Sequence, residues 1–252
     1  MKRVFILLYG VVCYLLFLAA FLYLIGFVGD LLVPRSVDRG NPSAGPGGWL
    51  ANLGLVALFG LQHGLMARRP FKAWITRFIP SAMERSTFVL ATVAVLTLLY
   101  TQWRPMPDVV WSVEHPVGRA VLHALFAAGF GIVLVSTFLI DHFDLFGLRQ
   151  SWLGFRGKPY TKLRFTTRLF YRHVRHPLML GFLIAFWATP TMTLGHLLFA
   201  GAMSCYIFVG IAMEERDLLR DDPQNYGAYR QTVPMILPLP RGRTAAAAVT
   251  AE

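Results

Sequence analysis

The feature that most constrains this chain is a series of long apolar runs separated by short polar stretches. The first run extends from Val4 to Val28 without a charged residue and follows Lys2 and Arg3. About 20 apolar residues suffice for a helix that crosses a bilayer, whereas the apolar core of a cleaved signal peptide is only about 7–15 residues long. The first run is therefore expected to remain in the protein as a membrane anchor.

Similar runs recur along the chain, in which 56% of residues are hydrophobic and only 15% are charged. This composition is typical of a membrane protein and not of a soluble domain. Proline and glycine residues between the runs exclude one continuous helix. We expect three further membrane spans, at Trp49–Met66, Ser86–Trp103 and Gly118–Ile140.

The last apolar region is interrupted at Pro190. Leu178–Ala188 is too short to cross a bilayer, and Leu194–Met213 follows it. A helical hairpin folded back at Pro190 fits both lengths better than one span. The predicted fold class is therefore an all-α integral membrane protein with four spans and a C-terminal helical hairpin. Residues 1–240 are expected to form a single polytopic domain, and the alanine-rich tail, 241–252, is expected to be disordered.

Lysine and arginine residues are unevenly distributed between the loops. With the spans above, 20 of them fall on one side of the membrane, most of them in 68–85 and 141–177. The four on the other side are Arg35, Arg39, Arg104 and Arg119. Because positively charged loops stay in the cytosol, both termini and the two long basic loops are expected to be cytosolic.

The net charge of +11 does not indicate a nucleic-acid-binding protein, because the basic residues lie between apolar segments and form no tract with stacking aromatics. Membrane lipid is the expected partner. Cys13 and Cys205 lie inside apolar runs without a CxxC or metal-ligand spacing. The sequence therefore predicts neither a disulfide framework nor a metal site.

The segment YRHVRHPLMLG, residues 171–181, places two arginines and two histidines before an apolar helix. Pro177 suits the first turn of that helix, where a missing N–H costs little. Arg172 and Arg175 can bind a carboxylate or phosphate with paired donors, and His176 can titrate near neutral pH. A basic collar at the membrane interface would explain the arginines but not the His-Pro arrangement, so a functional role is favoured.

A second polar cluster begins where the last apolar run ends. Glu214 and Glu215 lie about 100° apart on a helix, so one can bind a ligand while the other pairs with an arginine. Tyr226 and Tyr229 are three residues apart and precede Arg230, which gives an aromatic and cationic face. Taken alone, this second pattern is better explained by an amphipathic helix that rests on lipid.

His63, in the segment QHGLMARRPFK, lies near the cytosolic end of the second predicted span. The segment DHFDLFGLRQ ends the fourth predicted span on the same side. Polar side chains at such depths need a partner or a water-filled cavity. For His63, a structural role is at least as well supported as a catalytic one.

Together, RHPLMLG at 175–181, EERDLL at 214–219 and YGAYRQTVPMILP at 226–238 resemble the isoprenylcysteine carboxyl methyltransferase superfamily. These membrane enzymes use S-adenosylmethionine (SAM). Upstream, QHGLMARRPFK, ERSTFVLATVAVL, STFLIDHFDLFGLRQ and FWATPTMTLGHLLFA are similar to the bacterial methanethiol S-methyltransferase family. The resemblance implies a cytosolic SAM cleft between helices in the bacterial cytoplasmic membrane. The cofactor-binding residues it implies are Tyr171, Arg172, His173, Arg175, His176, Pro177, Glu214, Glu215, Tyr226 and Tyr229.

The implied activity is SAM-dependent methylation of a small thiol, with conversion of methanethiol to dimethyl sulfide as the expected reaction. A thiol must lose its proton before it attacks a methyl group. His176 and Glu214 are the candidates for accepting that proton, and His63 is a further catalytic candidate.

Three alternatives remain from the sequence. The methyl acceptor could instead be a lipid-linked thiol, another small thiol or a carboxylate. A haem-binding membrane isomerase or nitrogen-oxide-associated protein would need axial histidines at matching depth, and His63 and His123 match poorly. A membrane scaffold without catalytic activity would leave the cytosolic Arg, His and Glu clusters unexplained.

Overall fold

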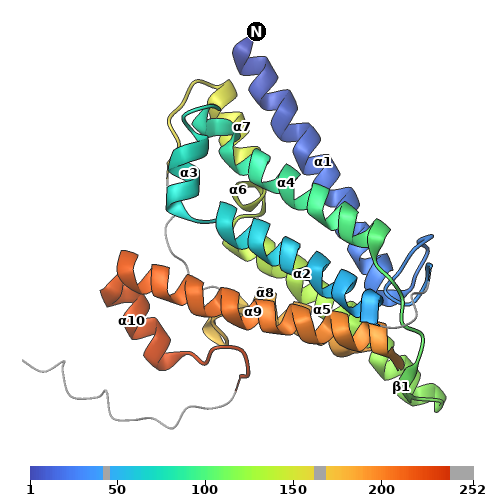
Figure 1. Cartoon of the computed structure of the whole chain (residues 1–252). Helices are drawn as coiled ribbons and strands as arrows, with labels where there is room; N and C mark the ends of the chain where they lie inside the picture. Colours follow the sequence, from blue (N-terminus) through green and yellow to red (C-terminus); the bar gives the residue numbers. More distant parts are fainter. Residues whose placement is uncertain (42–45, 162–168, 239–252) are drawn as a thin grey trace, which may run out of the picture.

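The computed structural model describes residues 1–41, 46–161 and 169–238, and within them it is almost entirely helical (Figure 1). The long helices are α1 (Lys2–Gly29), α2 (Pro46–Met66), α4 (Ser81–Gln102), α5 (Pro116–Ile140) and α9 (Leu194–Asp221). The shorter elements are α3 (Arg69–Ile75), β1 (Val109–Ser112), α6 (His142–Leu145), α7 (Leu148–Phe155), the 3-10 helix η1 (Leu169–Arg172), α8 (Pro177–Trp187), β2 (Thr191–Thr193) and α10 (Pro223–Thr232).

Five helices in the described ranges are long and apolar enough to cross a membrane, namely α1, α2, α4, α5 and α9. They correspond to the four predicted spans and the second arm of the predicted hairpin. The all-α fold with several candidate membrane-spanning helices is thereby confirmed. The tail expected to be disordered, 241–252, lies outside the described residues.

Two helix boundaries differ by five residues or more from those predicted from hydropathy. Helix α4 begins at Ser81, ahead of the expected Ser86, and carries Glu84 in its first turn. An acidic residue there is favourable because of the helix dipole. Helix α9 continues beyond the expected Met213 as far as Asp221. Hydropathy marks where a helix stops being apolar, and both helices extend further as polar turns.

The hairpin at Pro190 is present, and its first arm packs closely along α5. A Cβ atom added at Gly181 would lie 2.6 Å from the carbonyl oxygen of Gly129, and one at Gly129 would lie 2.7 Å from the carbonyl oxygen of Gly181. Small residues allow the backbones of membrane helices to approach in this way. The crossing therefore fixes the position of α8 against α5.

The turn of the hairpin is held at one end of the bundle by polar contacts. We call this the cap end, and it comprises residues 30–41, β1 and β2 (Figure 1). Strand β1 pairs antiparallel with β2. His196 Nε2 lies 2.9 Å from the carbonyl oxygen of Phe186, and its Nδ1 lies 3.4 Å from the Asp38 carboxylate. The Thr193 hydroxyl accepts a hydrogen bond from the His196 backbone N–H and donates one to Asp38.

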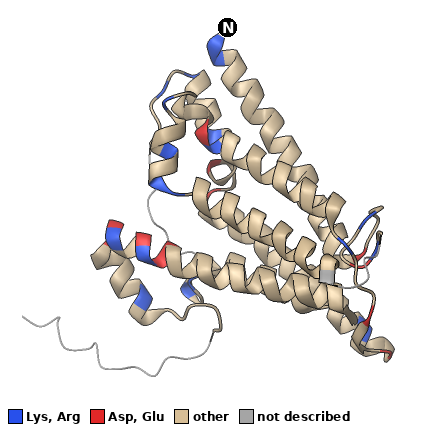
Figure 2. Cartoon of the chain, in the orientation of Figure 1, with Lys and Arg blue, Asp and Glu red and all other residues tan. Residues whose placement is uncertain are grey.

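Charged residues gather at the two ends of the bundle, and its middle is almost free of them (Figure 2). This distribution suits helices whose central turns are surrounded by hydrocarbon. Helix α1 packs against α4 and α7. It also contacts α6, where the Tyr14 hydroxyl lies 2.9 Å from His142 Nε2.

Candidate active site

The candidate site lies where α8 begins, at the end of the bundle opposite the cap end (Figure 1). Pro177 is the first residue of α8, where its fixed φ suits the first turn. The Arg175 backbone N–H donates to the carbonyl oxygen of Pro234 at 2.9 Å, and that of His176 donates to Met235 at 3.1 Å. The C-terminal segment, residues 223–238, therefore holds the start of α8 in place.

Arg175 forms a buried ion pair with Glu215 of α9. Its Nε donates to Glu215 Oε1 at 2.8 Å, and the two side chains are only 4% and 8% exposed. Its Nη1 also donates to the carbonyl oxygens of Arg230 and Val233, at 3.0 and 2.6 Å. Buried charges are stable only when they are paired and hydrogen-bonded. Arg175 thus joins α8, α9 and the C-terminal segment.

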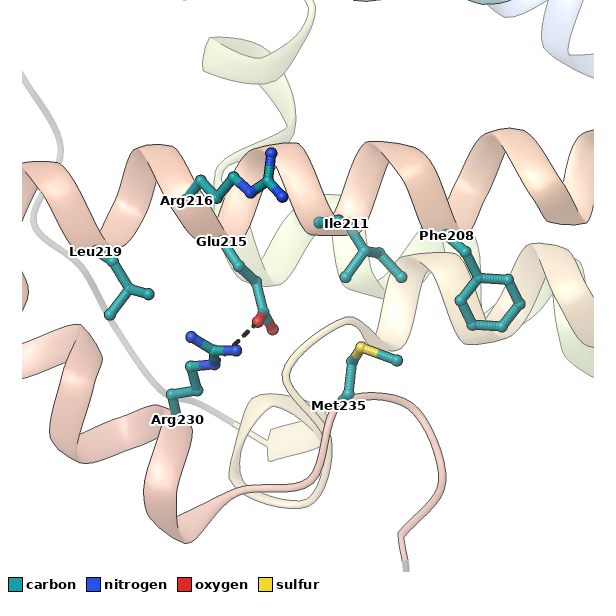
Figure 3. Close-up of a pocket in the computed structure, with 8 residues that line it drawn as sticks. Phe208, Ile211, Glu215, Arg216, Leu219, Arg230 and Met235 are labelled. Carbon is teal, nitrogen blue, oxygen red and sulfur yellow. Dashed lines mark ion pairs between the residues drawn. The ribbon is translucent and has the colours of Figure 1, made fainter.

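Glu215 has two further partners. His176 Nε2 lies 3.1 Å from Glu215 Oε1. Arg230 Nε lies 3.2 Å from Glu215 Oε2 (Figure 3). We call Arg175, His176, Glu215 and Arg230 the charged cluster. Because both oxygens of Glu215 are engaged, this carboxylate organises the cluster.

Glu214 differs from its neighbour in exposure. Its side chain is 52% exposed, and its Oε2 lies 3.7 Å from His176 Nδ1, beyond hydrogen-bond distance. The prediction that one of the two glutamates pairs with an arginine is confirmed for Glu215. The carboxylate of Glu214 remains accessible beside His176.

Aromatic side chains surround this corner. Tyr226 and Tyr229 of α10 are buried, with ring centroids 5.9 Å apart, and pack against Leu218 and Leu219 of α9. The Tyr229 hydroxyl donates to the carbonyl oxygen of Tyr171 at 2.6 Å. Burial raises the pKa of Tyr229 to about 12. Burial and the nearby Glu214 also raise the pKa of Tyr171, so both phenols remain neutral near pH 7.

A half-open groove of about 470 Å³ lies between α9 and the C-terminal segment (Figure 3). Its lining residues are Phe208, Ile211, Ala212, Glu215, Arg216, Leu219, Arg230 and Met235. Figure 3 shows the Glu215 and Arg230 side chains pointing toward each other. The groove thus has a charged wall and an apolar wall, and its volume is within the range of small-molecule sites.

The predicted site residues do not all lie together. Arg175, His176, Glu215, Tyr226 and Tyr229 converge at this corner, and Tyr171, Pro177 and Glu214 adjoin them. Arg172 and His173 are exposed instead, and they line a separate pocket of about 450 Å³ with Leu139 and Leu169.

His63 lies in a different environment. Its Nδ1 is 3.3 Å from the Thr92 hydroxyl, and its ring packs against Phe59, Phe88 and Tyr206. These neighbours belong to α2, α4 and α9, and none of them is in the charged cluster. The contacts support the structural role for His63.

Arg230 and Met235 are functional candidates that the sequence analysis did not include among the site residues. Arg230 completes the charged cluster. Met235 lines the groove, and its carbonyl oxygen accepts a hydrogen bond from the His176 backbone N–H. Both lie in YGAYRQTVPMILP, the segment that carries the family resemblance, and Arg230 also belongs to the aromatic and cationic face predicted from the sequence.

Comparisons with known proteins address the family of the chain. The family model for the NnrU protein matches residues 52–251. A methanethiol S-methyltransferase of Mycobacterium tuberculosis is 53% identical over 244 residues, which cover 97% of this chain and 100% of the relative. One of Crocosphaera subtropica is 48% identical over 238 residues, covering 94% and 93%. Nurim of Sus scrofa is 32% identical over 208 residues, covering 72% and 76%.

No solved structure matches the chain. The sequence matches, in contrast, extend through the helices and through the segments that build the charged cluster. The chain therefore belongs to the NnrU protein family and to the family of methanethiol S-methyltransferases that it matches over nearly its whole length.

Proposed function

We propose that this chain is a SAM-dependent methyltransferase that converts methanethiol to dimethyl sulfide. The observation that carries the proposal is its 53% identity, over the full length of the relative, to a protein named methanethiol S-methyltransferase. The name of that relative gives the class of reaction, and the charged cluster supplies a site for it. Methyl transfer is then expected at the end of the bundle where α8 begins.

The residues at this corner fit the chemical groups of SAM. The cofactor has a carboxylate, an ammonium, a sulfonium, ribose hydroxyls and a purine. The half-exposed Arg230 suits the carboxylate, and the accessible Glu214 suits a cationic group. Tyr171 lies beside Glu214 and adds an aromatic surface that favours a cation.

The reaction requires that a thiol become a nucleophile. SAM supplies an electrophilic methyl group when it is bound. The S–H bond of the thiol breaks, and its proton passes to His176 or Glu214. The thiolate sulfur would then take the methyl group as its bond to the sulfonium breaks, which would leave two neutral thioethers, dimethyl sulfide and the demethylated donor. Opposite charges disappear in this step, so the apolar wall of the groove, which limits water, favours it.

A direct test uses the purified full-length protein with labelled SAM and a panel of thiols and carboxylates. Labelled dimethyl sulfide in the headspace is expected with methanethiol. Methylation of a lipid-linked thiol or of a carboxylate without a volatile product would point to the alternative acceptors. If no acceptor is methylated and SAM does not bind, the proposal is wrong.

The role of His176 can be separated from cofactor binding. If His176 accepts the thiol proton, His176→Gln slows methyl transfer and leaves SAM affinity largely intact, and a higher pH partly restores the rate by supplying thiolate. Loss of SAM affinity without rescue by pH would instead assign His176 to cofactor binding. Calorimetry with SAM and product formation over a pH series distinguish these results.

The haem alternative is disfavoured by the positions of two histidines. His63 lies near the end of α2 that faces away from the cap end, whereas His123 lies in the part of α5 next to the cap end. Two axial ligands need to lie at one depth. An absorbance spectrum of the purified protein with a Soret band would restore this alternative.

We also propose that the site faces the cytosol of a bacterial cell, because the basic loops predicted to be inside adjoin it. The proposal can be tested with single cysteines in a variant that lacks Cys13 and Cys205. A cysteine at exposed Lys158 should react only after the membrane is permeabilised, whereas one at Val110 of β1 should react in intact cells. The reverse pattern would place the site outside.

A further inference from the structure

The polar extension of α9 carries three acidic residues on one face. Glu214, Asp217 and Asp221 are three and four positions apart, so they follow one another along the same side of the helix. The first of them lies beside His176, and the other two lie beyond the apolar part of α9.

Two arginines at the start of α3, its N-cap Arg68 and its first residue Arg69, bind two of these three carboxylates. Arg68 Nη1 lies 2.8 Å from Asp217 Oδ2, and Arg69 pairs with Asp221. These contacts join parts of the chain that are about 150 positions apart. They follow the packing of α2 on α9 inside the bundle, where the rings of Phe59 and Tyr206 are 5.3 Å apart.

Glu214 is different from the two aspartates. Among the described residues, its one ion-pair contact is with His176, and no arginine lies against it. Yet the Cβ atoms of residues three apart on a helix are only about 5–6 Å from each other. The long side chain of Arg68, bound to Asp217, is therefore within reach of Glu214 if Asp217 releases it.

We infer that Asp217 is a positioning residue that holds Arg68 away from Glu214 and so keeps this carboxylate available to the cationic part of the methyl donor. The inference rests on the proposed function, in which Glu214 faces that cation. Arg68 and Asp217 do not touch the donor. Asp217 acts by binding the Arg68 guanidinium, which keeps that group from contacting the Glu214 carboxylate.

The inference predicts that variants of Asp217 and Arg68 differ in SAM affinity, whereas an ion pair that only tethered α9 to α3 would make them alike. Asp217→Asn releases Arg68, which then competes with SAM for Glu214, so SAM affinity should fall by about fivefold, the scale of an exposed ion pair. Arg68→Gln removes the competitor and should leave SAM affinity within about twofold of the wild type. The double variant should recover to a similar level. If the pair only tethered α9, all three variants would lose the same affinity.

Arg220 provides the matched control. It also binds Asp217, with Nη2 2.9 Å from Oδ1, but it lies about 120° around the helix from Glu214. Adding Arg220→Gln to Asp217→Asn restores the same net charge as adding Arg68→Gln. Recovery only with Arg68→Gln supports the inference. Equal recovery with both would assign the effect to the general electrostatic field and overturn it.

SAM binding is measured by calorimetry on the detergent-solubilised full chain, and the unfolding temperature of each variant is recorded alongside. Asp30→Asn, which removes the exposed contact to Arg39 at the cap end, controls for loss of any surface ion pair. Glu214→Gln separates the two proposals. If it leaves SAM affinity unchanged, the role of Glu214 in the proposed function fails. If it weakens binding but Asp217→Asn does not, only the present inference fails.

Discussion

Glu215→Gln should destabilise the protein far more than the same change at the neighbouring Glu214. Glu215 is buried and accepts from Arg175 at 2.8 Å, with His176 at 3.1 Å and Arg230 at 3.2 Å. A glutamine has almost the same shape but only one acceptor oxygen and no charge. It would leave the buried guanidinium of Arg175 without a counter-ion.

The expected loss is about 3–5 kcal/mol, as for other buried ion pairs from which one partner is removed. The free energy of unfolding of a typical protein is only about 5–15 kcal/mol, so this loss is a large part of it. Glu214→Gln changes a half-exposed side chain that makes no hydrogen bond to the described part of the chain, and it should cost less than about 1 kcal/mol. It should instead weaken SAM binding.

Thermal unfolding in detergent, followed by circular dichroism, compares the two variants with the wild type. A large decrease in unfolding temperature for Glu215→Gln and almost none for Glu214→Gln is expected. Equal decreases would refute the assignment of Glu215 as the organising carboxylate. Equal decreases would mean that water reaches the charged cluster, and the argument from a buried charge would then be wrong.

Two other predictions concern packing and a single hydrogen bond. Gly181→Ala should destabilise the protein by about 1–3 kcal/mol, because its methyl group would lie 2.6 Å from the carbonyl oxygen of Gly129. Gly201→Ala is the control, because a Cβ atom at Gly201 meets nothing within 4 Å, and it should leave stability unchanged. Thermal unfolding of both variants checks this. Tyr229→Phe should cost about 0.5–1.5 kcal/mol by removing the bond to Tyr171. Burial raises the pKa of Tyr229 from 10.0 to about 12. The contribution of the neutral Tyr229 phenol to stability should therefore be complete below pH 10 and decline as the pH rises toward 12. Chemical denaturation at several pH values would measure this decline.

The helices were predictable because hydrocarbon imposes a simple rule on sequence. A segment such as Val4–Val28 has few alternatives to a membrane-spanning helix, and it lies within α1. The polar end of α9 was not predictable in this way. Its last turns, which end at Asp221, contact Arg68, Arg69 and α10, and these contacts depend on the tertiary fold.

The grouping of residues at the candidate site was predictable where motifs carried it and not where local geometry decided. The segments with Arg175 and Glu215 were expected to meet, and they form the buried ion pair. Arg172 and His173 belong to the same motif, but the 3-10 turn before α8 directs them toward another pocket. The contact of His196 with Asp38 joins residues 158 positions apart, and no sequence period connects them.

The way the C-terminal segment closes the charged cluster has a consequence for biosynthesis. Arg175 receives its carbonyl partners from Arg230 and Val233, which follow every membrane helix of the described chain. While the ribosome is still making α9, the Arg175 side chain lacks these partners, and the groove lacks its Met235 wall. The nascent protein can therefore insert all its apolar helices before it is able to assemble the cluster, so membrane integration and acquisition of the site are successive events.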